Sequence, residues 1–323
     1  MISKVKSNKI ISTLLIIMCI IILFNPTLYA KACLNAISVW SFNVLPLLFP
    51  FFVFTRLIVS LNQQRQNFME KYFSKLYRTP TGSFNTFFLS ALSGYPMGAK
   101  LICTMHENGQ ATSKEAEKML SFCSISGPMF MLGTVGIMML KSYKAGFIIL
   151  ISNIVASLIN GLIFRGKPEK IKQNYHSTKK NTNNLLSESV HDALVSILMV
   201  GAYIVLSFLL IELLKNLKIF EIINTAICRV FNLHSSRDVV DSILSGLIEI
   251  TGGILNLSTT TIPLSLKTII ASSLVGFGGI SVMLQSLNFL SALHIPFKTM
   301  FVQKLSQAFI ALLITTPLAL MFL

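Results

Sequence analysis

Charged side chains are scarce in this sequence. Only 12% of the 323 residues are Asp, Glu, Lys or Arg, whereas a soluble domain usually carries about 25%. Hydrophobic residues make up 53% of the chain, and the mean hydropathy is +0.70. The composition therefore excludes an ordinary soluble domain, because the chain has too few charges to cover a water-exposed surface.

Disulfide and metal-binding patterns are also missing. The cysteines form no CxxC pair and no spacing with histidine that is typical of zinc, which argues against a disulfide framework and a zinc site. No nucleophile–base pair, P-loop or metal-ligand cluster is visible, so we expect no enzyme, no catalytic residue, no cofactor and no metal. The five cysteines are Cys19, Cys33, Cys103, Cys123 and Cys228.

Acidic residues are fewer than basic ones, and this imbalance points to a membrane. The chain has 27 Lys and Arg against 12 Asp and Glu, a net charge of +15. The basic residues gather in short loops between apolar runs, as the positive-inside rule describes. No basic stripe with interleaved aromatic residues accompanies them, so we expect a lipid bilayer and no nucleic acid as partner.

Long apolar runs are abundant, and each is long enough to cross a bilayer as a helix of roughly 20 residues. Backbone groups in lipid must be hydrogen-bonded within the segment, which favours helices, and the period-two alternation of barrel strands is not seen. The first run could be a cleaved signal peptide, but we expect it to be retained as an anchor. The predicted crossings are 10–30, 36–61, 112–140, 144–165, 188–215, 263–290 and 296–322.

The two halves of the chain repeat one plan of a long span, an amphipathic piece, an interrupted hairpin, a broken helix and a final span. An offset of 152 residues aligns Leu92-Ser93-Gly94 with Leu244-Ser245-Gly246, and Gly127 with Gly279. The amphipathic pieces are 67–78 and 220–231, and the hairpins are 83–108 and 238–257. The predicted domains are an N-terminal transmembrane helix (1–32), a first membrane repeat (33–165), a basic cytoplasmic linker (166–186) and a second membrane repeat (187–323).

Loop charge predicts how these repeats sit in the membrane. With a cytoplasmic N-terminus and a re-entrant hairpin at 83–108, the basic loop 62–82 and the Lys-rich linker both lie inside. Each repeat then has three crossings, so the second repeat is inverted relative to the first, and the chain crosses seven times. The predicted fold is therefore an all-α polytopic membrane protein with two inverted repeats, each with a re-entrant hairpin and a broken transmembrane helix.

Four backbone breaks carry the functional prediction. They are the two hairpin tips, at 93–98 and 250–253, and the two broken helices, at 124–128 and 276–279. Freed backbone groups at membrane depth are tolerated only beside protein or a wet cavity, and half-helix N-termini attract anionic or polar solutes. Inverted repeats with such breaks are typical of secondary transporters. The alternative is that these Gly and Pro residues only allow close helix packing.

Two ionisable residues lie near the hairpin tips. A charge at membrane depth costs roughly 3 kcal/mol or more and therefore indicates function. Lys100 would neutralise an anionic solute, and Glu249 would bind a hydroxyl or a cation or accept a coupling proton. The alternatives are that the two pair with each other or that one reaches to the interface. The predicted substrate-binding residues are Ser93, Gly94, Pro96, Lys100, Ser126, Gly127, Glu249, Gly278 and Gly279.

Several blocks of the first half resemble a known family. They are residues 92–100 (LSGYPMGAK), 120–130 (LSFCSISGPMF) and 133–136 (GTVG), together with Trp40 and the following 45–52 (LPLLFPFF). These blocks resemble the YlbJ family of sporulation integral membrane proteins, and the likeness extends over nearly the whole chain.

The second half is similar to the wider Gate, or nucleoside recognition, domain. The blocks that carry this likeness are 245–249 (SGLIE) and 276–282 (GFGGISV). The same domain occurs in concentrative nucleoside transporters.

The resemblance implies a protein of endospore-forming bacteria that passes dipicolinic acid across the outer forespore membrane. Dipicolinate is a small aromatic dianion, which suits Lys100 and the half-helix N-termini. A nucleoside or nucleobase carrier and a non-transporting scaffold for spore cortex assembly stay open as alternatives. The expected location is the cell membrane or the outer forespore membrane, and a coupling ion, a proton or a second copy of the chain stay open as partners.

Overall fold

The computed structural model describes residues 2–61, 68–167, 184–231, 237–290 and 293–323, and every regular element within these ranges is helical. The helices, with η marking π-helical stretches, are α1 (Ile2–Phe24), α2 (Pro26–Val39), η1 (Trp40–Val44), α3 (Leu45–Leu61), α4 (Phe68–Tyr77), α5 (Ser83–Ser93), α6 (Met97–Glu107), α7 (Ser113–Cys123), η2 (Met129–Met139), α8 (Tyr143–Ile163), α9 (Leu185–Asn216), α10 (Ile219–Phe231), α11 (Arg237–Ile248), α12 (Ile250–Thr259), α13 (Leu264–Phe277), α14 (Gly279–Leu290) and α15 (Phe297–Phe322). The predicted all-α class is confirmed.

Five helical stretches are long and apolar enough to cross a membrane, which confirms a polytopic membrane protein. Their outward faces carry exposed apolar side chains, as Leu305, Phe309 and Leu313 do on α15. Such side chains suit contact with lipid tails. The five stretches are Pro26–Ile58, Tyr143–Ile163, Leu185–Asn216, Leu264–Leu290 and Phe297–Phe322.

The N-terminal boundary differs from the prediction. The first span was predicted to run to about residue 30 and the second to begin at 36, but α1 ends at Phe24 and an unbroken helical stretch runs from Pro26 to Leu61. Pro26 occupies the start of α2, where its fixed φ and its missing N–H are tolerated. The predicted border of the first domain, at 32/33, therefore falls inside α2.

Both predicted hairpins form. In the first, α5 and α6 pack together around the tip at Gly94, Tyr95 and Pro96. In the second, α11 and α12 pack together around Glu249, so the break lies one residue before the predicted tip, and residues 250–253 begin α12. Gly94 has φ +73°, and a Cβ there would lie 2.8 Å from the Gly127 Cα. Only glycine combines that backbone angle with so close an approach.

Both predicted broken helices are also present. The first is interrupted at residues 124–128, between α7 and η2, and the second at Gly278, between α13 and α14. A capping box starts α7: Glu115 N donates to Thr112 Oγ1 (3.2 Å), and Thr112 N donates to Glu115 Oε2 (3.0 Å). Gly278 has φ +81°, the left-handed conformation that commonly ends a helix.

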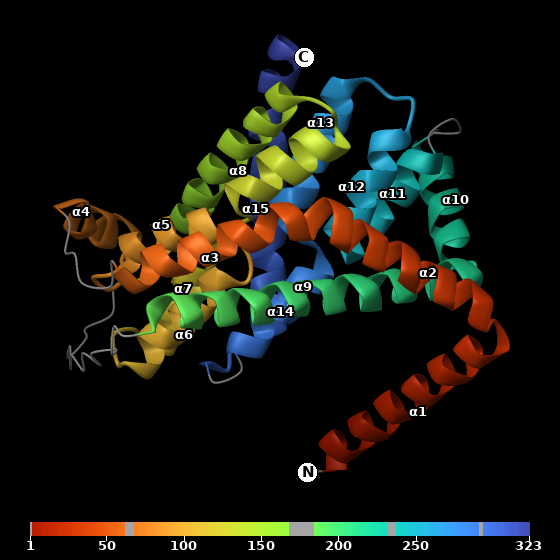
Figure 1. The fold of residues 1–323 in the computed structure, drawn as a ribbon, viewed down its shortest axis with the longest axis horizontal. Coiled ribbons are helices and arrows are strands. Elements are labelled where there is room, and N and C mark those ends of the chain that lie inside the picture. The colour runs from red at the N-terminus through yellow and green to blue at the C-terminus, as the bar shows by residue number, and fades with distance from the viewer. Residues whose placement is uncertain (1, 62–67, 168–183, 232–236, 291–292) are drawn as a thin grey trace.

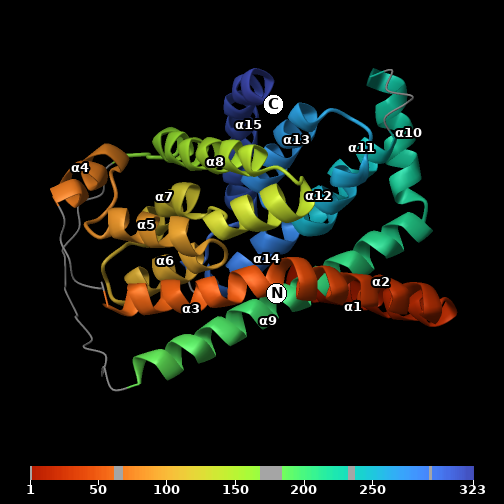
Figure 2. The same ribbon diagram turned by 45° about the horizontal axis from the view of Figure 1, so that its top comes forward.

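The amphipathic pieces form α4 and α10, which lie at opposite ends of the molecule in both views (Figures 1 and 2). On α4, the buried Glu70 accepts from the backbone N–H groups of Phe84 (3.0 Å) and Asn85 (3.3 Å), at the start of α5. This carboxylate satisfies backbone donors that the first turn of a helix leaves unpaired. It therefore fixes the first hairpin to the amphipathic helix before it.

The order of elements is the same in the two halves, as the predicted repeat requires. In each half a long helix is followed by a short amphipathic helix, a hairpin, a broken helix and a final long helix. The orientation of the two halves in a membrane stays a prediction. Residues 168–183 of the predicted linker lie outside the described residues.

The equivalent long helices of the two halves lie side by side. The stretch α2–η1–α3 runs antiparallel to α9 along one side of the molecule (Figure 1). The helices α8, α13 and α15 pack together behind it, and the broken segments lie between these two layers. This arrangement brings all four breaks toward the middle of the molecule.

Candidate functional site

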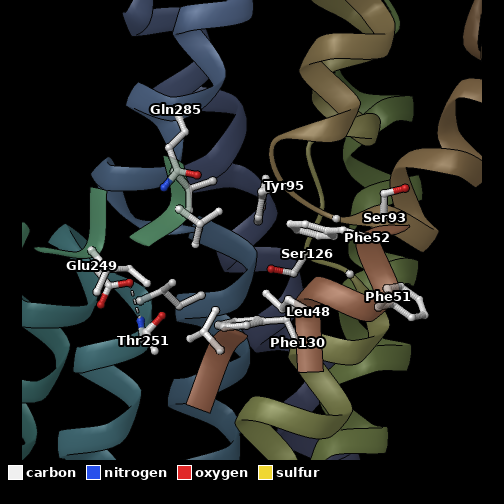
Figure 3. Close-up of a pocket in the computed structure, with 17 residues that line it drawn as sticks. Leu48, Phe51, Phe52, Ser93, Tyr95, Ser126, Phe130, Glu249, Thr251 and Gln285 are labelled. Atoms are coloured by element: carbon white, nitrogen blue, oxygen red, sulfur yellow. Dashed lines mark hydrogen bonds between the residues drawn. The ribbon is translucent and has the colours of Figure 1, made fainter. Parts of the chain in front are cut away.

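A cavity of about 60 Å³ lies where the breaks meet. A buried water needs about 10–15 Å³ of such space, so the cavity has room for several water molecules. Figure 3 shows Glu249 and Thr251 on one side, Ser93 and Phe52 on the other, and Tyr95 and Ser126 between them. The lining residues are Val44, Leu48, Phe51, Phe52, Ser93, Gly94, Tyr95, Ser126, Gly127, Phe130, Val200, Ile204, Glu249, Ile250, Thr251, Val282 and Gln285.

The cavity joins both repeats. The first hairpin tip contributes residues 93–95, the first broken helix 126–127, the second hairpin tip 249–251, and α14, just after the second break, contributes Val282 and Gln285. Five predicted residues therefore meet around one space: Ser93, Gly94, Ser126, Gly127 and Glu249.

The remaining wall is apolar and rich in aromatic residues. Phe51 and Phe52 come from α3 and Phe130 from η2, while Val200 and Ile204 come from α9. Pockets for small molecules usually combine such a wall with a few polar groups that orient the ligand. The polar groups here are concentrated at the backbone breaks.

Glu249 lies at the second hairpin tip and is almost fully buried, with 2% exposure. Its carboxylate oxygens accept from Thr251 N (2.9 Å) and Gly252 N (2.7 Å), at the start of α12. The partial positive charge of a helix N-terminus stabilises a carboxylate in this position. Glu249 therefore closes the N-terminus of its own half-helix, which was predicted to be open to a solute.

Ser93 lies at the first hairpin tip, at the end of α5. Its hydroxyl is buried and has no hydrogen-bond partner among the described residues. A buried polar group without a partner costs about 1–3 kcal/mol, so water or a ligand in the cavity would offset that cost. Among the polar groups at the site, the Ser93 hydroxyl is thus the clearest candidate to bind a water molecule or a ligand.

Pro96 lines a smaller cavity of about 10 Å³ next to the first. Ser93, Phe52 and Tyr95 line both spaces. Pro96 therefore lies beside the main cavity and not on its wall.

Lys100 is not among the lining residues of either cavity. Lys100 is on α6, and its Nζ lies 3.2 Å from Oδ2 of Asp192 on α9. Arg56 is on α3, and its Nη1 lies 3.2 Å from the same oxygen. The structure therefore places Lys100 in a charge cluster that links three helices. It does not pair with Glu249, which was one of the predicted alternatives.

Gly278 and Gly279 form the second break and lie behind the cavity. A Cβ on Gly278 would lie 3.1 Å from the Tyr95 hydroxyl, and one on Gly279 would lie 3.1 Å from Ile248 O. Both have positive φ, +81° and +76°. Their part in the site is to let the second break approach the two hairpin tips closely, and neither lines the cavity.

The sequence reasoning missed four polar residues at the site. Tyr95, Thr251 and Gln285 line the cavity, and Lys304 on α15 lies directly behind Tyr95. Lys304 is 2% exposed, and its Nζ donates to Ser124 O (2.8 Å), to Gln307 Oε1 (2.9 Å) and to the Tyr95 hydroxyl. A lysine within a predicted membrane span, 296–322, is a signal that could have found it.

Comparison with known proteins gives one informative match. The chain is 27% identical over 332 aligned positions to the sporulation integral membrane protein YlbJ of Bacillus subtilis (strain 168). The alignment covers 94% of this chain and 81% of that relative. No protein-family model matches the chain, so the Gate domain stays a prediction.

Proposed function

Because this chain belongs to the YlbJ family of sporulation integral membrane proteins, we propose that it is a carrier that moves a small polar or anionic solute across a membrane during spore formation. The similarity supports a membrane role in sporulation. Transport is the further step, and one observation supports it: all four backbone breaks lie against or directly behind a single cavity.

Helix breaks are expensive where no water is present. Each unsatisfied backbone group in a bilayer costs several kilocalories per mole, so breaks persist only beside protein or a wet space. A scaffold has no need of four breaks that meet at one point. A carrier uses such breaks to bind its solute near the middle of the membrane, between repeats that move relative to each other.

The proposed passenger is dipicolinic acid, and the proposed membrane is the outer forespore membrane. The aromatic wall of Phe51, Phe52 and Phe130 suits a planar ring. The unpartnered Ser93 hydroxyl is a donor for a carboxylate, and the Lys304 side chain behind Tyr95 adds positive charge to the same side of the cavity. Together these groups favour a small aromatic anion.

A nucleoside is the second candidate, because the same aromatic wall would stack on a nucleobase. Charge separates the two candidates. A nucleoside is neutral and gains little from a nearby ammonium group, whereas a dianion gains Coulomb energy that grows in a low-dielectric site.

The test is solute uptake by the purified full-length chain in liposomes, with labelled dipicolinate and uridine measured side by side. We expect saturable uptake of dipicolinate that excess unlabelled dipicolinate inhibits and excess uridine does not. Protein-free liposomes are the control for leakage. Competition by uridine alone would favour the nucleoside carrier, and well-folded protein that transports neither solute would leave the scaffold as the better hypothesis.

A further inference from the structure

Lys304 and Glu249 are the most deeply buried ionisable groups at the site. Lys304 lies on α15, the last helix of the second repeat, and is 2% exposed. Its partners belong to the first repeat and to its own helix: Tyr95 at the first hairpin tip, Ser124 at the end of α7, and Gln307 one turn further on. The side chain therefore joins the two repeats.

The three hydrogen-bond partners of Lys304 match the donors of a charged ammonium. The Ser124 carbonyl and Gln307 Oε1 can only accept. The Tyr95 hydroxyl donates its own proton to Ser124 O (3.3 Å), so it too accepts from Lys304. A charged ammonium has three protons to donate, and three acceptors surround it.

No carboxylate lies within ion-pair distance of Lys304 in the part of the chain that the structure describes. One of its three partners is the Ser124 carbonyl, which lies at the C-terminal end of α7 where the first broken helix unwinds. The C-terminal end of a helix carries partial negative charge and favours a cation. A cation is thus held by oxygen atoms at an unwound half-helix.

That position is where a secondary transporter with broken helices binds a coupling cation. In such carriers, unwound backbone carbonyls and half-helix C-termini coordinate sodium ions. We propose that the Lys304 ammonium takes the place of this coupling cation, so that the carrier needs no sodium ion. This inference rests on the proposed function for its transport consequence, but the cation position itself can be tested without transport.

The first prediction concerns the unaltered protein. Dipicolinate uptake into liposomes should proceed at the same rate, within about twofold, in sodium, potassium and choline salts of equal ionic strength, because the cation is covalently attached. A requirement for sodium, with uptake about tenfold slower in both other salts, would overturn the inference.

The second prediction concerns the position that the side chain leaves. Lys304→Ala leaves three oxygen atoms, from Ser124, Gln307 and Tyr95, without their donor. A small cation that enters should restore part of the lost stability, because binding to the folded state alone stabilises it. The melting temperature of purified Lys304→Ala should therefore rise in sodium or ethylammonium chloride above its value in choline chloride, and that of the unaltered protein should not.

Lys304→Met and Lys304→Arg separate charge from volume. Methionine fills the space without charge, so Lys304→Met should lose at least about tenfold in uptake and show no cation-specific shift in melting temperature. Arginine keeps the charge, so Lys304→Arg should retain more uptake than Lys304→Met. Near-normal uptake by Lys304→Met would contradict the inference, and this variant carries the test if Lys304→Ala does not fold.

Lys267 provides a matched control. Its Nζ also donates to a carbonyl near a helix C-terminus, Ser258 O (2.7 Å), but it is only half-buried and away from the cavity. Lys267→Ala should show the same melting temperature in sodium and choline chloride. If sodium raised the melting temperatures of Lys267→Ala and Lys304→Ala equally, the effect would be a general salt effect and would contradict the proposal.

The two readouts keep the inference and the proposed function apart. If the protein carries neither dipicolinate nor uridine but Lys304→Ala is selectively stabilised by sodium or ethylammonium, the cation position stands and the carrier hypothesis fails. If uptake occurs but depends on sodium, the carrier hypothesis stands and the role assigned to Lys304 fails.

Discussion

The two hairpin tips differ in backbone and in chemistry: three residues separate α5 from α6, with Gly94 at φ +73°, whereas the single extended residue Glu249 separates α11 from α12. At the second tip, Glu249 accepts from the N–H groups that begin α12, so that half-helix is closed by its own chain. At the first tip, no side chain caps the start of α6, and the Ser93 hydroxyl has no partner among the described residues. The first tip is open toward the cavity, whereas the second is internally satisfied.

This difference shows that a structural repeat does not imply a symmetric site. The second tip has its helix start capped by Glu249, which makes this part of the wall rigid. The first tip supplies the unpartnered Ser93 hydroxyl, and Lys304 lies behind Tyr95. We therefore expect the solute to bind mainly to the first tip.

The largest expected effect is a loss of stability, which we compare at the two glycines that the 152-residue offset aligns, Gly94 and Gly246. Gly94→Ala forces a left-handed backbone angle on alanine and drives its Cβ into the Gly127 backbone, so we expect loss of folded protein, about 3 kcal/mol or more. At Gly246, which the 152-residue offset aligns with Gly94 but which lies inside α11, the atoms nearest to an added Cβ belong to the Leu274 side chain. That side chain can move, so Gly246→Ala should cost about 1–3 kcal/mol. Yield of monodisperse protein and melting temperature measure both. Equal losses would remove this distinction.

The next effect tests whether the second tip is structural. Glu249→Ala leaves two buried backbone donors without an acceptor, and a hydrogen bond to a charged group is worth about 1.5–3 kcal/mol. We expect a clear fall in melting temperature and in uptake. Glu249→Gln keeps one acceptor oxygen and should lose less stability. A variant with unchanged stability and lost uptake would instead assign Glu249 directly to the solute.

A smaller effect is expected at Ser93, which we compare with Ser245, the serine that the 152-residue offset aligns with it. Ser93 and Ser245 are both buried, and both hydroxyls lack a partner among the described residues, but only Ser93 lines the cavity. Ser93→Ala should raise the KM for uptake by about tenfold if it removes one hydrogen bond to an anion. Ser245→Ala should leave the KM unchanged. Neither substitution should lower the melting temperature, and an equal rise in KM for both would argue against an asymmetric site.

The smallest effect is expected at Lys100. It is partly exposed and shares Asp192 with Arg56, so its ion pair is of the weak surface kind, worth about 0.2–1 kcal/mol. Lys100→Ala should lower the melting temperature slightly and change the KM less than Ser93→Ala does. A loss of uptake comparable to that of Ser93→Ala would instead support the prediction from the sequence that Lys100 binds the solute.

The positions of the breaks could be predicted because their causes are local. Glycine at positive φ and proline at the start of a helix leave marks in the sequence, and Gly94, Gly278 and Gly279 mark breaks in the structure as well. The capping box of Thr112 and Glu115 is equally local. The same signals placed Ser126 and Gly127 beside the cavity.

The direction in which a side chain points could not be predicted in the same way. Lys100 lies on α6 only a few residues after the first tip, and whether it faces the cavity or Asp192 on α9 depends on how that helix is rotated. Lys304 reaches the site only through packing of α15 against α7 and the first tip. Such tertiary contacts leave no trace in one sequence, although a lysine within the predicted span 296–322 is itself a visible signal.

The contact between Trp40 and Gly201 makes the protein its own optical reporter. Trp40 is the single tryptophan of the chain; its indole lies over Gly201, where a Cβ would come within 2.7 Å of the ring, and Nε1 donates to Ile197 O (3.2 Å). Val200 and Ile204, from the same stretch of α9, line the cavity. All tryptophan emission therefore arises at the crossing of the two equivalent long helices, one turn from the cavity wall, and sliding at that crossing would change it without any attached dye.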